Sequence, residues 1–183
     1  METATLAGGC FWCTEAIYQR LKGVGSVVSG YSGGSIDSPT FKQVSSGNTG
    51  HAESIQIEFD PSVISFEKIL DVFFTTHDPT TLNRQGPDVG TQYRSVIFYH
   101  DDKQNEIAKR KIEILNRVQD DKGAGKIVTK VESFKNFYPA ENYHQNYYET
   151  NKNSAPYCPL VIDPKIQKLM KEFSEDIKQE YKS

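Results

Sequence analysis

The stretch HAESIQIEFDPSVISFEKILDVFFTTH, residues 51–77, contains a strand pattern followed directly by a helix pattern. In its first part Ile55, Ile57 and Phe59 share one face and polar side chains share the other, as in a half-buried strand. Its second part is an amphipathic helix with one apolar stripe, made of Phe66, Ile69, Leu70, Phe73 and His77. A strand that leads into such a helix predicts a sheet with helices packed on it.

The rest of the chain continues this alternation. Strand patterns occupy residues 3–7, 26–31, 91–100 and 126–134, and helix patterns occupy residues 13–22, 103–119 and 163–177. Gly23 is the expected stop of the first helix, and Asp163 is the expected N-cap of the last. The β-α-β-β-α-β-like order predicts an α+β fold, a two-layer α/β sandwich with a ferredoxin-like mixed sheet, flanking helices and long loops.

Length and composition place bounds on the function. The 183 residues suit a single domain over 1–183, in which 153–183 form a C-terminal segment with Cys158 and the last helix. A net charge of −3 gives no basic footprint for nucleic acid. No apolar run approaches the roughly 18 residues of a membrane span, and no signal-peptide pattern is visible. We therefore expect a cytoplasmic protein, and nothing in the sequence demands more than a monomer.

The segment LAGGCFWCTEA, residues 6–16, carries the most reactive side chains of the sequence. Three cysteines cannot all pair within one chain, so free, catalytic or metal-bound thiols are expected. Cys10 lies where a strand ends and a helix begins, near unpaired N–H groups and the positive end of the helix dipole. This position predicts a pKa below the roughly 8.5 of a free thiol. The two glycines before it would let backbone approach a substrate closely.

Several kinds of site could use these thiols. Cys10 and Cys13 could form a thioredoxin-like C-x-x-C pair, although Phe-Trp is an unusual insert. Cys10, Cys13 and Cys158 with one histidine could bind zinc, but no second metal-binding spacing exists. A Cys-His hydrolase is a third alternative, and two buried, inert thiols are a fourth.

The neighbours of Cys10 favour a different chemistry. Phe11 and Trp12 could form an apolar wall for a methyl or thioether group. Glu53 falls on the apolar face of its strand, where burial should raise its pKa and keep it protonated. A thiolate, an aromatic pocket and a neutral acid suit attack on an electrophile whose oxygen must be protonated.

The sequence resembles the A type of the peptide methionine sulfoxide reductase family, which acts on the S epimer at sulfur. The matching blocks are GGCFW at 8–12, GYSGG at 30–34, GHAE at 50–53, FDPSVIS at 59–65, HDPTTLNRQGPDVGTQYRS at 77–95 and AENYHQNY at 140–147. They cover most of the chain from about 5 to 165, and their combination is highly specific. The resemblance implies a two-layer α/β sandwich around a mixed sheet.

The resemblance also implies a set of catalytic roles. Cys10 would attack the sulfoxide sulfur, and Glu53 would protonate the oxygen. Tyr93 and Asp88 match positions that hydrogen-bond this oxygen or order a nearby water. Methionine would leave, and Cys10 would become a sulfenic acid.

Further implications concern the pocket and the substrates. Phe11 and Trp12 match the pocket that grips the methyl group, and His144 matches a position in the active-site surround. The substrates would be oxidised proteins and free methionine sulfoxide. A second thiol would form a disulfide with Cys10, which thioredoxin or a dithiol would reduce. No metal or organic cofactor is implied.

Two positions depart from the family pattern. Cys158 matches the usual C-terminal resolving cysteine, whereas Cys13 stands where many members have glycine. We expect Cys158 to resolve first and Cys13 to act as a second shuttle, because a bridge across a helical turn would be strained. SPTF replaces the usual NPTY, so Phe41 in the pocket lacks a phenolic donor and leaves Glu53 and Tyr93 to bind the oxygen. The rival function is a thiol–disulfide exchange or redox-sensing module that uses Cys10 and Cys13 without Glu53.

Overall fold

The sheet at the centre of the molecule follows the predicted mixed arrangement. The structure is a computed structural model and describes residues 1–182. Six strands lie in the order β7-β6-β1-β3-β2-β8, and only the β6–β7 pair is parallel. Their bounds are β1 Glu2–Gly8, β2 Val24–Ser32, β3 Ala52–Phe59, β6 Ser95–Tyr99, β7 Lys130–Ser133 and β8 Tyr138–Pro139. The inner order β6-β1-β3-β2 is that of a βαββαβ ferredoxin-like unit, so the predicted fold class is confirmed.

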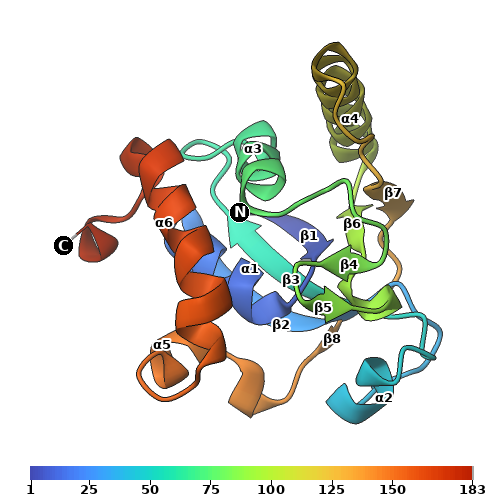
Figure 1. Cartoon of the computed structure of the whole chain (residues 1–183), viewed down its shortest axis with the longest axis vertical. Helices are drawn as coiled ribbons and strands as arrows, with labels where there is room; N and C mark the ends of the chain where they lie inside the picture. The colour runs from blue at the N-terminus through green and yellow to red at the C-terminus, as the bar shows by residue number, and fades with distance from the viewer. Residues whose placement is uncertain (183) are drawn as a thin grey trace.

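Six α-helices accompany this sheet in the described part of the chain. They are α1 Phe11–Gln19, α2 Phe41–Ser45, α3 Phe66–Thr76, α4 Asp102–Lys122, α5 Tyr147–Asn151 and α6 Asp163–Glu172. Figure 1 shows α6, in red, running across α1, and α4 extending away from the sheet beside β7. A two-stranded hairpin, β4 (Arg84–Gln85) and β5 (Asp88–Val89), lies within the long loop after α3. None of the helices in the described part of the chain is long and apolar enough to cross a membrane.

The alternation of β3 places its side chains as expected. Ile55, Ile57 and Phe59 are fully buried in the main core with residues of α1, α3 and α6. Ser54 on the opposite face is also buried, because a smaller cluster of Ala7, Ala52, Val96 and Phe98 covers part of that face. Glu53 is on the same face as Ile55 and therefore points toward the helix layer.

Several element boundaries differ from the expectation: β6 and β7 begin four residues later than predicted, and α6 ends at Glu172 instead of 177. Helix α1 begins at Phe11 and ends at Gln19, and Gly23 lies beyond it in a turn with φ +80°. Helix α6 is continuous with a π-helical turn over Cys158–Ile162, so Asp163 is no N-cap. Its Oδ1 instead accepts a hydrogen bond from the Tyr148 hydroxyl at 2.6 Å.

Candidate active site

The connection between β1 and α1 places Cys10. Cys10 is the N-cap of α1 and is 6% exposed. Gly9 before it has a φ of +95°, and a Cβ there would lie 2.6 Å from Cγ of Gln85. The glycine is thus required by backbone conformation and by packing against Gln85, and the predicted reason, close approach of a substrate, is not needed.

The predicted low pKa of Cys10 is wrong. Burial raises the pKa of the Cys10 thiol well above its ordinary value, and the neighbouring Cys13 and Glu53 raise it further. The backbone N–H of Trp12 acts in the opposite direction but is outweighed. The helix N-terminus does favour a thiolate, but loss of hydration at a buried sulfur is the larger effect.

Glu53 provides the neutral acid that the sequence predicts. Its side chain is buried, and Oε2 accepts a hydrogen bond from the backbone N–H of Phe11 at 3.1 Å. Burial raises the pKa of Glu53 to about 8, although the Phe11 N–H lowers it. The carboxyl group therefore holds its proton at neutral pH, and its hydrogen-bond partner Phe11 is the residue that follows Cys10.

Aromatic rings gather around the start of α1. Phe11 is fully buried, with its ring centroid 5.8 Å from that of Tyr31 and 6.5 Å from that of Phe41. Trp12 is partly exposed and stacks on Tyr147 with centroids 3.7 Å apart and ring planes at 7°. Phe11, Trp12 and Phe41 thus lie together as expected for an apolar pocket, and Tyr147 adds to it.

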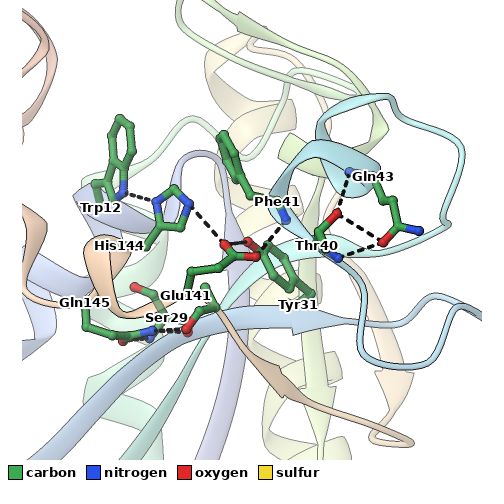
Figure 2. Close-up of polar contacts among 10 residues, drawn as sticks. Trp12, Ser29, Tyr31, Thr40, Phe41, Gln43, Glu141, His144 and Gln145 are labelled. Atoms are coloured by element: carbon green, nitrogen blue, oxygen red, sulfur yellow. Dashed lines mark hydrogen bonds and ion pairs between the residues drawn. The ribbon is translucent and has the colours of Figure 1, made fainter.

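A polar network through His144 and Glu141 connects Trp12, Tyr31 and Phe41. The Trp12 indole N–H donates to His144 Nδ1 at 3.1 Å, and His144 Nε2 lies 3.4 Å from Glu141 Oε2 (Figure 2). Glu141 also accepts from the Tyr31 hydroxyl at 3.1 Å and from the Phe41 backbone N–H at 2.9 Å. Because an indole N–H only donates, His144 must be unprotonated at Nδ1 and carries its proton on Nε2. Burial lowers the pKa of His144, which maintains this neutral form.

Tyr93 and Asp88 reach the same site from the loop that follows α3. Tyr93 is half-buried, and burial raises the pKa of its hydroxyl, with further increases from Glu53, Asp88 and Cys10. Asp88 Oδ2 accepts a hydrogen bond from the Tyr157 hydroxyl at 2.6 Å. Tyr157 and Glu141 also belong to this site and were not predicted from the sequence. The signals for them were the aromatic residue next to Cys158 and the acid within AENYHQNY.

The two candidate resolving thiols are both buried and unpaired. Cys13 is the third residue of α1, and its backbone N–H bonds the Cys10 carbonyl at 3.1 Å. Because Cys10 has the extended backbone of an N-cap residue, a Cys10–Cys13 bridge would join the N-cap to the third helical residue and not two residues within the helix. Cys158 is fully buried at the start of the π-helical turn. Burial raises its pKa, and Asp163 and Cys13 add to this increase.

The alternative sites find less support in the geometry. Within residues 1–182, no group of three or more His, Cys, Asp or Glu side chains is arranged to hold a metal ion. His51 bonds the Gly34 N–H and the Ile36 carbonyl, His77 bonds Ser95, and His100 bonds Thr5. Only His144 lies among the site residues, and its Nδ1 is occupied by Trp12. A cysteine–histidine hydrolase therefore has no free base beside Cys10 in the described part of the chain.

Known proteins are similar to this chain along nearly its whole length. The family model described as "Peptide methionine sulfoxide reductase" matches residues 2–178. A Sulfolobus acidocaldarius protein named peptide methionine sulfoxide reductase MsrA is 54% identical over 175 residues, which are 96% of this chain and 97% of that protein. The reduced form of Mxr1 from Saccharomyces cerevisiae is 43% identical with a TM-score of 0.73, covering 84% of this chain and 87% of that chain. Mxr1 in complex with Trx2 is 32% identical with a TM-score of 0.51, covering 80% and 84%.

Proposed function

Because this chain belongs to the peptide methionine sulfoxide reductase family, we propose that Cys10 and Glu53 together reduce the S epimer of methionine sulfoxide, in proteins and as the free amino acid. One observation carries this assignment to particular residues. The buried, protonated Glu53 accepts a hydrogen bond from Phe11, the residue next to Cys10, so the acid is held beside the residue that follows the nucleophile.

The chemical step follows from these two groups. The Cys10 sulfur attacks the sulfoxide sulfur, and Glu53 gives its proton to the sulfoxide oxygen as the sulfur–oxygen bond of the substrate breaks. The thiol proton of Cys10 replaces the one that Glu53 gave. The released hydroxide then adds to the Cys10 sulfur as the new bond between the two sulfurs breaks. The substrate sulfur thereby gains two electrons and leaves as methionine, while the Cys10 sulfur loses two and becomes a sulfenic acid. The partial positive charge on a sulfoxide sulfur would favour the Cys10 thiolate that burial otherwise suppresses.

The surrounding residues bind and orient the substrate in this proposal. Phe11 and Trp12 hold the methyl group against the wall that Phe41 completes, and His144 fixes the indole through its Nδ1. Tyr93 and Asp88 hold the oxygen or a water beside it. Phe41 has no hydroxyl, so Tyr93 is the phenolic donor left for the charge that develops on oxygen.

Recycling uses thiols and no resident cofactor. A disulfide between Cys10 and a second thiol, Cys13 or Cys158, removes the sulfenic acid as water. Thiol–disulfide exchange with a thioredoxin or another dithiol then restores the enzyme. The complex of Mxr1 with Trx2 supports a thioredoxin as the partner.

An exchange assay beside a reduction assay tests this function against the rival exchange module. We expect Glu53→Gln to lower methionine formation from an oxidised peptide by at least about 10²-fold, because general acid catalysis is lost. The same variant should exchange thiols with a small disulfide at least as fast as the wild type, because Glu53 raises the pKa of Cys10. Glu58→Gln, at an exposed position of the same strand, is the matched control. A Glu53→Gln variant with full reductase activity would overturn the proposal.

A further inference from the structure

Tyr157 lies between two groups of the site. Its hydroxyl is 2.6 Å from Asp88 Oδ2 and 3.9 Å from Cys13 Sγ, and its ring meets Trp12 edge-on at 5.6 Å between centroids. These contacts seat the residue before Cys158 against α1 and the β4–β5 hairpin. Tyr157 is thus a phenolic group at the site that comes from the C-terminal segment.

The direction of the hydrogen bonds follows from the chemistry of the three groups. A carboxylate only accepts, so the hydroxyl proton of Tyr157 points to Asp88 at the short distance of 2.6 Å. The phenolic oxygen keeps lone pairs that can accept from the Cys13 S–H. Cys13, Tyr157 and Asp88 therefore form a chain in which each proton can move one step toward the carboxylate.

Cys13 needs such a route because its thiol is closed to solvent. The residue is 1% exposed, with Cys10, Tyr157, Asp88 and Lys165 as the titratable groups that act on it most strongly. Its interaction with Cys10 lowers the pKa of Cys13 most, and Lys165 and Tyr157 lower it further, against the effects of burial and Asp88. The surroundings thus lower the pKa of the Cys13 thiol, so this thiol loses its proton more readily, whereas burial keeps the Cys10 thiol protonated.

This inference rests on the proposed function. We propose that Tyr157 is a catalytic residue of the resolving step, which passes the proton of Cys13 to Asp88 as Cys13 attacks the Cys10 sulfenic acid. The sulfur–sulfur bond forms and the sulfur–oxygen bond of Cys10 breaks. The hydroxyl of the sulfenic acid takes a proton from Glu53 and leaves as water. Solvent then carries the proton that Asp88 received back to Glu53. The Cys10 sulfur gains one electron relative to the sulfenic acid and Cys13 loses one, so no outside reductant takes part.

The order of the thiols follows from this relay. Cys13 forms the first bridge with Cys10, and Cys158 then attacks Cys13 by thiol–disulfide exchange. This order differs from the expectation from sequence, which put Cys158 first. Cys10 has the extended backbone of an N-cap residue, so this bridge would join the N-cap to the third helical residue and not two residues within the helix.

Tyr157→Phe tests the relay in a single turnover without reductant. Methionine sulfoxide is mixed with reduced enzyme, and samples are quenched for methionine, for dimedone-trapped Cys10 sulfenic acid and for disulfide mapping by mass spectrometry. We expect one methionine per chain, followed by Cys10–Cys13 bridge formation that is slower by about 10²-fold, with sulfenic acid accumulating. The variant's bridge formation should also rise more steeply with pH than the wild type's, because Cys13 must then ionise unaided.

Two further variants make the result decisive. Tyr148→Phe is the matched control, because its hydroxyl also donates to a carboxylate at 2.6 Å, that of Asp163, and it should resolve at the wild-type rate. Asp88→Asn keeps an acceptor without a base, and it should slow bridge formation relative to sulfenic acid formation as Tyr157→Phe does. Bridge formation at the wild-type rate in Tyr157→Phe, or a first bridge between Cys10 and Cys158, would overturn the relay. A wild-type chain that forms no methionine would overturn the proposed function, and the relay with it.

Discussion

The backbone N–H of Phe11 donates a hydrogen bond to Glu53 Oε2 across 3.1 Å, and so joins the first residue of α1 to β3. This bond holds the carboxyl group beside the helix start that presents Cys10. It also lowers the pKa of Glu53, yet burial keeps that pKa at about 8. The pairing thus orients an acid without removing its proton at neutral pH.

The first prediction concerns the pH dependence of the chemical step. Glu53 donates only while it is protonated, so first-turnover methionine formation should fall as pH rises through about 8. Rapid-quench measurements between pH 6 and pH 9.5, a range chosen to bracket this value, would show the decline. Glu53→Gln should be slow throughout, without this decline. A wild-type rate that rises steadily across the range would contradict Glu53 as the proton donor.

The second prediction concerns stability. The pKa of Glu53 is about 8 in the folded state against an ordinary 4.5, so its favourable effect is full below about 4.5 and is lost as pH rises through 8. The free energy of unfolding of Glu53→Gln should therefore exceed that of the wild type increasingly over this window, by up to a few kcal/mol at high pH. Urea unfolding at several pH values measures the difference. The buried Glu15, whose pKa burial raises to about 7, titrates in both proteins and cancels in the comparison.

The third prediction concerns the missing phenol. The Phe41 ring stacks with Phe11 and lies 4.4 Å from the His144 ring between centroids. Phe41→Tyr should raise kcat for the S epimer by up to about tenfold, because a second donor would share the charge on the sulfoxide oxygen. Phe74→Tyr, at a partly buried position outside the pocket, should leave kcat unchanged. A lower kcat in Phe41→Tyr would show that the pocket needs an apolar ring there.

The fourth prediction concerns the support of Trp12. His144→Phe keeps a ring but removes the acceptor of the indole N–H, so the indole should lose its fixed orientation. We expect KM for an oxidised peptide to rise by about tenfold, which corresponds to one lost hydrogen bond, with a smaller change in kcat. The control is His100→Phe, at a residue that bonds Thr5 and stacks on Phe134. Equal KM values in the two variants would remove His144 from substrate positioning.

Local patterns predicted the parts of the fold that depend on neighbours in sequence. The alternation around Ile55 and the stripe through Phe73 gave β3 and α3, because both reflect burial of one face. The same alternation placed Glu53 on the buried face and so predicted its raised pKa.

Contacts between distant segments were not predictable in this way. Trp12 and His144 are 132 residues apart, and Asp88 and Tyr157 are 69 apart, so no periodicity relates them. The prediction of a low pKa for Cys10 was wrong for the same reason. Its position before a helix is local, whereas its burial depends on several segments that pack over it.

The most direct test of Cys10 as the nucleophile is a single turnover of the reduced chain with each resolved epimer of methionine sulfoxide and no external reductant. We expect one methionine per chain from the S epimer alone, with Cys10 oxidised first to the sulfenic acid and then to a disulfide. No methionine from either epimer, with Cys10 still open to alkylation, would contradict it.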